Sequence, residues 1–488
     1  MDVTSSRTRS SGGAAGAGAG SRERRRRLAF FAVCLGNFIV MLDTNIVNLA
    51  LPHIRESLHG SLAGLLWVAN GYTLTVAALI LNGGALADRL GNDRAYRWGA
   101  VGFAAASLAC ALAPTLPALV VLRVVQGAFG ALLLPSLLGL IPHLFTDPVR
   151  RARAVSVWAS SGAVALAAGP LLAGVLIDGV GWRSIFSINV PICLAVYAIV
   201  RWTIDDAPRR AGAGLDLPGQ VLAVAGLGAL CFTLIEGPAY GWGSPVIWLA
   251  AAVAAVAVVA FVLVERHGAS PLLPPRLFAD RTFTVAVAAG LVFQFVYFGA
   301  LFIFALYLQD GLQEGGRDTA LTAGLMFLPL TLCTAVTPTL LTNRIAARYG
   351  LRGPMVAGAV LGVPGCLLVL LCDTSSPYWL LGVAMGLQGL WSGLTLPPTA
   401  SLAVAGTPKD LAGTGSGVLN AARQVGGVVG VAVFGALTAT AGTVTGGLHL
   451  AMGVSAAGVA FIAGLVLVTG TGRRVPAPSA AAPSDASS

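Results

Sequence analysis

The sequence carries little charge for its length. Of its 488 residues only 10% are Asp, Glu, Lys or Arg, whereas 56% are hydrophobic. An ordinary soluble domain carries about 25% charged residues. This shortage excludes a typical soluble enzyme and predicts a chain that crosses a membrane many times.

The usual motifs of catalysis and of ATP use are also missing. The only lysine, Lys409, follows Thr-Pro, so the chain has no Gly-x-x-x-x-Gly-Lys-Ser/Thr loop that could cradle phosphates. The seven cysteines form no Cys-x-x-Cys pair, and no metal-ligand cluster or hydrolytic triad is visible. We therefore expect no enzymatic activity, no cofactor and no metal. Any transport would draw on an ion gradient or run passively.

What the chain has instead is a series of apolar runs of about 20 residues, the length that a helix needs to span a bilayer. We predict an all-α membrane protein with fourteen such spans. They are expected at 28–52, 62–85, 95–113, 116–140, 153–176, 184–202, 216–236, 245–264, 283–308, 319–341, 353–372, 377–402, 412–437 and 446–469.

The basic residues test this count. With the N-terminus in the cytoplasm, 25 of the 30 Lys and Arg residues fall on the cytoplasmic side, three fall outside, and Arg123 and Arg423 fall within spans. This bias follows the positive-inside rule and argues against nucleic acid as the reason for the net charge of +10. We expect a multi-pass protein of the bacterial plasma membrane with both termini cytoplasmic.

Two short motifs recur at similar offsets and suggest a duplicated architecture. Ala-Asp-Arg-Leu-Gly at 87–91 matches Ala-Ala-Arg-Tyr-Gly at 346–350, and Gln126-Gly127 matches Gln388-Gly389. Such repeats typically place a binding site near the midplane between two halves. We predict a disordered basic tail at 1–27, six-helix bundles at 28–202 and 283–470, a linker with two inserted helices at 203–282, and a disordered tail at 471–488.

The residue with the largest burial cost is Asp43, which lies inside the first span. A carboxylate in hydrocarbon costs about 3 kcal/mol on insertion scales. Asp43 lies about 14 Å and Arg123 about 10 Å from the outer ends of their spans, so the two could pair. Breaking that pair would let Asp43 take a proton and act as a switch. A static structural ion pair is the alternative.

Other polar groups fall within or at the ends of the spans. Arg423 has no acidic residue of similar depth in its own half, and Glu236 is expected at the outer end of the seventh span, where water could reach it. The groups singled out here are Asn48, Asn189, Glu236, Gln294, Asn420, Arg423 and Gln424.

Small residues mark two further segments. The fifth span contains Gly162, Gly169, Pro170 and Gly174; small residues allow close helix packing, and proline permits bending. The loop after the second span contains Gly84, Asp88, Arg89 and Gly91, where the acid and the base could latch neighbouring helices in one state. Ordinary membrane-helix composition and a solvated turn are the respective alternatives.

Taken in order, these motifs resemble the major facilitator superfamily, and within it the fourteen-helix drug:proton antiporters, similar to antibiotic-resistance exporters of the methylenomycin type. The resemblance rests on Leu-Asp-Thr-Asn-Ile-Val-Asn-Leu-Ala-Leu-Pro at 42–52, the loop at 84–91, Arg-Val-Val-Gln-Gly at 123–127, the segment 165–174, Trp-Arg-Ser-Ile-Phe-Ser-Ile-Asn-Val-Pro at 182–191, Glu-Gly-Pro at 236–238 and Asn-Ala-Ala-Arg-Gln at 420–424. Two departures stand out: Asn92 and Asp93 replace the usual basic residues, and Ala165 and Ala173 replace glycine.

The resemblance implies proton-coupled efflux of a small organic compound, an antibiotic or drug-like molecule, by alternating access. It assigns coupling or substrate binding to Asp43, proton transfer to Arg123, gating to the loop at 84–91 and the antiporter signature to the fifth span. The expected partners are a small-molecule substrate, protons and the lipid bilayer, with a monomer as the working unit and no nucleic acid. A proton-coupled importer and a non-transporting receptor or scaffold are the alternatives.

Overall fold

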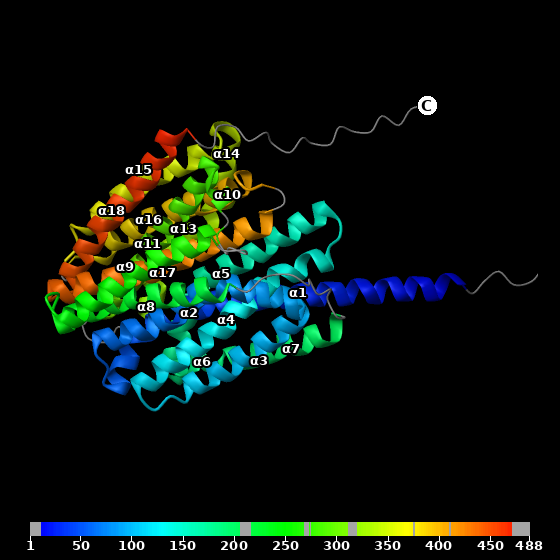
Figure 1. Ribbon diagram of the computed structural model, residues 1–488, viewed down its shortest axis with the longest axis horizontal. Helices are drawn as coiled ribbons and strands as arrows, with labels where there is room; N and C mark the ends of the chain where they lie inside the picture. The colour runs from blue at the N-terminus through cyan, green and yellow to red at the C-terminus, as the bar shows by residue number, and fades with distance from the viewer. Residues whose placement is uncertain are drawn as a thin grey trace, which may run out of the picture.

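The computed structural model describes residues 11–204, 216–267, 273, 275–310, 320–373, 376–408 and 411–470. Within these ranges the chain folds into helices joined by short turns (Figure 1). In the first part of the chain these are α1 (Ser11–Leu58), α2 (Leu62–Leu90), α3 (Asn92–Ala111), α4 (Leu116–Leu144), α5 (Pro148–Val180), α6 (Ser184–Ser187) and α7 (Asn189–Thr203).

The remainder of the chain continues the same pattern, with one broken span. Its helices are α8 (Leu217–Tyr240), α9 (Pro245–His267), α10 (Pro275–Phe278), α11 (Arg281–Asp310), α12 (Ala320–Met326), α13 (Leu328–Thr337), the π-helix η2 (Pro338–Thr342), α14 (Asn343–Tyr349), α15 (Arg352–Val369), α16 (Tyr378–Ala405), α17 (Ala412–Ala441) and α18 (Val444–Thr469). α12 and the helical run after it are bent by 41° at Phe327, where Pro329 removes a backbone donor.

Twelve helices of the described chain are long and apolar enough to cross a membrane, and the bent α12–α14 pair is a thirteenth. The protein is therefore a multi-pass membrane protein, and the part of the chain that the structure describes is built from helices without strands. α3 corresponds to the expected span 95–113, but polar Asn92, Asp93, Arg94 and Arg97 occupy its first turns. Because of these polar residues, α3 is not apolar enough to be among the twelve helices counted above.

Two expected boundaries were wrong. The segment 1–27 was expected to be a disordered tail, but α1 is helical from Ser11, in a stretch rich in alanine, the residue with the highest helix propensity. α8 continues past Glu236 to Tyr240 with Pro238 inside it, so Glu236 is not at a helix end. Residues 1–10 and 471–488, parts of the two expected tails, lie outside the described residues.

The helices pack in two groups. α1–α7 contact mainly one another, through α1 with α5, α2 with α4 and α3 with α4 and α7. α11–α18 do the same, through α11 with α17 and α18 and α15 with α16 and α18. α8 and α9 form a pair, and α8 contacts both α2 of the first group and α17 of the second.

The surface of the bundle has the apolar character that lipid requires. On α9, large apolar side chains are exposed, including Trp248, Leu249, Val256 and Val259. Water-facing helices would show a polar face instead. α9 therefore presents most of its circumference to the bilayer.

The two ends of the bundle differ in charge. We call the end where α1 begins the basic end, because Arg89, Arg94, Arg150 and Arg201 also lie at helix termini there, and the opposite end the far end. α1 extends beyond the bundle at the basic end (Figure 1).

The two groups meet closely at the far end. A Cβ added at Gly174 of α5 would lie 2.6 Å from the Cα atom of Leu321 in α12, and one added at Gly324 would lie 2.5 Å from the Pro170 carbonyl oxygen. The Asp178 carboxylate accepts hydrogen bonds from the backbone N–H groups of Ala320 (3.1 Å) and Leu321 (2.8 Å), at the start of α12. Farther along, α14 packs on α15.

Glycine also sets the distance between α11 and α17 inside the second group. A Cβ at Gly430 would lie 2.2 Å from the Phe295 carbonyl oxygen. We predict that Gly430→Ala lowers the melting temperature of the purified protein by a few degrees, because forcing two packed helices apart costs about 1–3 kcal/mol. The matched control is Gly464→Ala in α18, where an added Cβ meets no atom within 4 Å. Equal melting temperatures for the two variants would contradict this packing.

Candidate functional site

Asp43 and Arg123 are in contact inside the first group. α1 and α4 pack against each other, and Arg123 Nη1 lies 2.5 Å from Asp43 Oδ2. The exposed fraction of the Asp43 side chain is 0% and that of Arg123 is 1%. The pairing expected from their depths is therefore present, and neither charge reaches solvent in this conformation.

Two side-chain amides complete the shell of the carboxylate. Asp43 Oδ1 accepts hydrogen bonds from Gln126 Nε2 (3.0 Å) and Asn189 Nδ2 (2.7 Å). Both amides also donate to the hydroxyl oxygen of Ser107, at 2.6 and 3.1 Å respectively. The network thus ties α1, α3, α4 and α7 together through fully buried polar groups.

Arg123 is held on every side. Its Nε donates to the Val68 carbonyl oxygen (3.2 Å), and Nη1 also donates to Gln126 Oε1 (2.7 Å). The guanidinium carbon lies 4.4 Å from the ring centroid of Tyr72 and 5.7 Å from that of Phe186, which gives two cation–π contacts. These contacts hold the guanidinium group in one orientation and stabilise its positive charge.

The geometry defines the surroundings of the carboxylate. Asp43 accepts hydrogen bonds from one guanidinium and two amides, so Arg123 lies where it can balance a negative charge on Asp43. A substrate could not touch it without opening the network. Protonation would leave Arg123 without its anionic partner, and a buried unpaired charge is costly.

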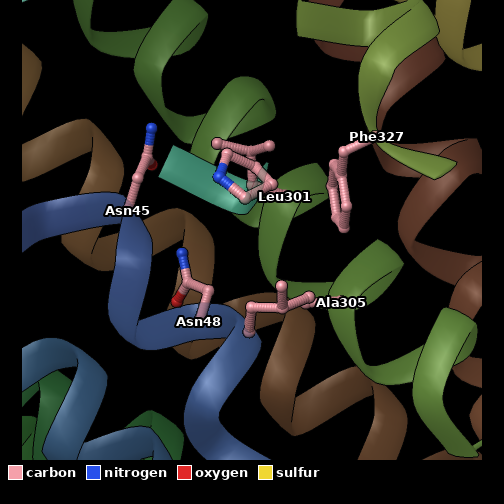
Figure 2. Close-up of a pocket in the computed structure, with 7 residues that line it drawn as sticks. Asn45, Asn48, Leu301, Ala305 and Phe327 are labelled. Atoms are coloured by element: carbon pink, nitrogen blue, oxygen red, sulfur yellow. The ribbon is translucent and has the colours of Figure 1, made fainter. Parts of the chain in front are cut away.

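The asparagines of α1 turn toward α5. Asn37 Nδ2 donates to the Trp158 carbonyl oxygen (2.9 Å), and Asn45 Nδ2 donates to that of Leu166 (3.4 Å). Asn45 and Asn48 also line a small pocket between the two groups (Figure 2). Its remaining lining is apolar: Leu49, Pro170, Leu301, Ala305 and Phe327.

The small residues of α5 serve two interfaces. Gly162 and Gly169 face α1, where an added Cβ would lie 2.8 Å from Asn37 Nδ2 and 3.2 Å from Asn45 Cβ. Pro170 and Gly174 face α12 at the far end. α5 therefore lies between the helix that carries Asp43 and the first helix of the broken span.

The predicted gating loop forms the junction between α2 and α3. Gly91 has φ +93°, a conformation that a residue with a Cβ rarely adopts, and it ends α2 and begins α3. Gly84 is in ordinary contact with Pro135, and Arg89 is exposed. Asp88 makes no hydrogen bond or ion pair with any residue that the structure describes. The expected latch is thus not formed by Asp88 in this conformation.

The remaining predicted site residues lie apart from the Asp43 network. Glu236 Oε1 accepts a hydrogen bond from Trp67 Nε1 (2.9 Å), which links α8 to α2. Asn420 and Arg423 lie on α17 in the second group, and both are partly buried.

The charged pair has no counterpart in the second group. In the first group Arg123 lies three residues before Gln126. At the equivalent position in the second group, three residues before Gln388, the residue is Met385, which is fully buried. Gln388 Nε2 donates to the sulfur of Met452 (3.3 Å). The two halves are similar in helix order and different in charge.

Comparison with known proteins decides the family. The family model described as "Major Facilitator Superfamily" matches residues 33–431 and again 332–486. The chain belongs to the major facilitator superfamily. It is a membrane transporter of that superfamily and not an enzyme, and it lies in the bacterial plasma membrane.

Curated relatives within the superfamily cover most of the chain. It is 37% identical over 405 residues to the "Methylenomycin A resistance protein" of Streptomyces coelicolor, covering 83% of this chain and 84% of the relative. It is 35% identical over 421 residues to the "Tetracenomycin C resistance and export protein" of Streptomyces glaucescens (84% and 75%). It is 33% identical over 412 residues to the "Multidrug resistance protein Stp" of Mycobacterium tuberculosis (84% and 76%).

Solved structures support the fold alone. A crystal structure of the peptide transporter POT in complex with sulfate aligns with a TM-score of 0.66 at 14% identity, covering 91% of this chain and 95% of that chain. The human organic anion transporter MFSD10 (TETRAN) aligns with a TM-score of 0.63 at 16% identity, covering 90% and 99%. At such identities only the superfamily architecture is shared.

Several site residues carry no clear sequence signal. Ser107 lies in α3, whose polar start weakens the span pattern, and a lone serine among alanines has no distinguishing neighbour. In the sequence Tyr72 cannot be distinguished from other core aromatic residues. Only the structure shows that its ring contacts the Arg123 guanidinium group. Asp178 was not singled out, because an acid near the end of a span is common. Only its contact with α12 distinguishes it.

The ion pair predicts non-additive stability. Arg123→Gln alone leaves a buried carboxylate uncompensated, and breaking a buried pair costs about 3–5 kcal/mol. We expect this variant to melt well below wild type, and the double variant with Asp43→Asn to recover at least half of the lost melting temperature. Thermal unfolding of the four purified proteins measures the coupling. Additive losses would show that the two charges do not interact.

Proposed function

We propose that the protein exports a small drug-like organic compound in exchange for protons, by alternating access, through a bundle of fourteen spans. The observation that carries the proposal is the fully buried Asp43–Arg123 network in the first group. An ionisable residue within a span is functional by default because its burial is costly. The resistance and export functions named for the relatives favour export over import.

In this proposal the basic end faces the cytoplasm, and so do both termini. The positive-inside rule supports that orientation. α3 is the fourteenth span: its 20 residues suffice for a hydrocarbon core of about 30 Å, and its polar first turns lie at the basic end, in the interfacial region. Helices α8 and α9 are inserted between two six-helix halves.

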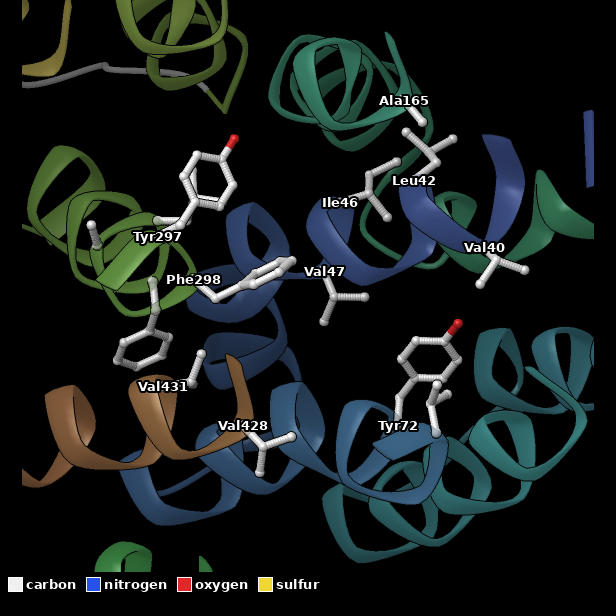
Figure 3. Close-up of a cluster of buried hydrophobic side chains, with 14 of the residues drawn as sticks. Val40, Leu42, Ile46, Val47, Tyr72, Ala165, Tyr297, Phe298, Val428 and Val431 are labelled. Carbon is white, nitrogen blue, oxygen red and sulfur yellow. The ribbon is translucent and has the colours of Figure 1, made fainter. Parts of the chain in front are cut away.

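The conformation described here is then closed to the outside. α5 and α12 are in close contact at the far end, and Asp178 caps α12. Val47 of α1 and Phe298 of α11 lie near one another in the buried cluster between the groups (Figure 3). In this proposal the compound binds at the pocket lined by Asn45 and Asn48, which lies beside this closure.

The proposed cycle follows from the charges. While Asp43 is ionised, its three donors hold α1, α4 and α7 together. When the bundle opens to the outside, a proton from that side neutralises Asp43, weakens all three hydrogen bonds and frees α1 to shift against α5. Because α5 closes the far end, the shift of α1 reaches the external gate. Release of the proton to the cytoplasm restores the network.

Neutralising Asp43 tests the proposed function. We predict that Asp43→Asn reduces drug resistance in an exporter-deficient bacterial host to the level of an empty vector, because the asparagine cannot exchange a proton. Glu56→Gln is the matched control, since Glu56 is an exposed acid on the same helix. Minimal inhibitory concentrations across a compound panel measure the effect, with membrane levels checked for each variant. Full resistance with Asp43→Asn would refute the assignment.

The far-end contact gives a second prediction. Gly174→Ala should reduce export several-fold, because its Cβ would approach the Leu321 backbone to 2.6 Å and disturb the closed state. Gly179→Ala in the same helix should leave export unchanged, because an added Cβ there meets no atom within 4 Å. Initial rates of dye efflux from energised cells measure both. Equal rates would mean that α5 does not close the path.

A further inference from the structure

Arg423 is a second arginine inside a span, and its environment is the opposite of that of Arg123. It lies about midway along α17, and its Nε atom is buried without a hydrogen-bond partner. Within the described chain it makes no ion pair and no hydrogen bond. A cation at this depth is expensive unless something neutralises it. No acidic residue of the described chain does so.

The aliphatic part of Arg423 lies where three helices of the second group meet. A Cβ added at Gly290 of α11 would lie 3.2 Å from Arg423 Cγ and 3.6 Å from Thr399 Cγ2 of α16. The absence of a side chain at Gly290 therefore makes room for the arginine. The side chain as a whole is only partly buried, so part of it is accessible.

A second unpartnered polar side chain lies next to this position. Gln294 stands one helical turn beyond Gly290 on α11, is 7% exposed, and makes no hydrogen bond with any described residue. Residues four apart share a helix face. The amide therefore extends the face of α11 against which Arg423 packs. On α17, Asn420 lies one turn before Arg423 and is likewise without a partner in the described chain.

The same face of α11 leads to the pocket. Leu301 and Ala305 are seven and eleven residues beyond Gln294, positions that return to one face of a helix, and both line the pocket shown in Figure 2. They lie about 10 and 16 Å farther along the axis. This face of α11 therefore has the unpaired cation and the amides at one end and the apolar pocket at the other. An amphipathic ligand has the matching combination of a charged group and an apolar body.

We propose that Arg423 and Gln294 bind the anionic group of the transported compound, which makes the substrate class an amphipathic organic carboxylate. The guanidinium matches a carboxylate with paired N–H donors, and the Gln294 amide can donate a further hydrogen bond. The apolar body of the compound lies toward Leu301 and Phe327. The inference rests on the proposed export function, and it separates substrate binding in the second group from proton binding at Asp43 in the first.

The test measures binding to the purified full-length protein in detergent, without any gradient. The probes are 1-naphthoate, 4-phenylbutanoate and indole-3-acetate, each paired with its neutral primary amide, and sodium chloride as the inorganic anion. Ligand-dependent melting temperatures give apparent affinities. We expect at least one carboxylate to bind wild type at least tenfold more tightly than its amide, because hydrogen bonds between two ionised groups are stronger than those to a neutral amide.

The variants locate the effect. Arg423→Gln should abolish the preference for the carboxylate, Arg423→Lys should keep part of it, and Gln294→Leu should weaken carboxylate binding several-fold. Arg344→Gln, an exposed arginine of α14, is the matched control and should behave as wild type. Arg423→Lys and Gln294→Leu retain a test of the site if Arg423→Gln fails to fold.

Three results would overturn the inference: no carboxylate preferred over its amide by wild type, the preference unchanged in Arg423→Gln, or chloride reproducing the full effect. Asp43→Asn should retain carboxylate binding, which separates this inference from the proposed function. Loss of export with binding intact is a result about coupling. Export of an anionic compound undiminished by Arg423→Gln would reject the binding site and leave the export function standing.

Discussion

The burial of one carboxylate in the hydrocarbon region constrains the whole first half of this transporter. Asp43 has no access to water, so protein groups must supply what solvation would give. Arg123, Gln126 and Asn189 do so from α4 and α7, and Ser107 orients both amides from α3. The positions of four helices therefore depend on a single negative charge. Any event that neutralises that charge changes the packing of the half.

The two halves differ in the charged residues that they bury. The first half holds a balanced and sealed ion pair, whereas the second half holds Arg423 without a described partner and the apolar Met385 at the repeat position of Arg123. A sealed pair suits a switch that responds to one proton. An open cation suits recognition of a ligand. The pocket between Asn48, Leu301 and Phe327 lies where the halves meet, so occupancy there can influence both.

Much of this arrangement could be predicted from the sequence, and the parts that could not have physical reasons. Depth along a helix follows from residue counting, which placed Asp43 and Arg123 at one level. Rotation about the helix axis does not, so Ser107 and Tyr72 were missed. Glu236 was expected at a helix end because Gly237-Pro238 follows it, but proline within a membrane helix is tolerated when neighbours satisfy the backbone.

The small residues of the fifth span are a second case in which the sequence does not give the direction of a side chain. The glycines of the fifth span predicted close packing, but not that Gly169 faces α1 while Gly174 faces α12. Partner identity depends on which helices are adjacent, which is a property of the tertiary fold. The bend at Phe327 and the distribution of α5 contacts between two helices became visible only in three dimensions.

In the proposed cycle the proton moves through Asp43. This is tested by following luminal pH with a trapped dye in proteoliposomes while a gradient of an exported compound is imposed. Wild type is expected to move protons against the compound, whereas Asp43→Asn is expected to equilibrate the compound without moving protons. Proton movement of undiminished size in Asp43→Asn would contradict the proposed cycle.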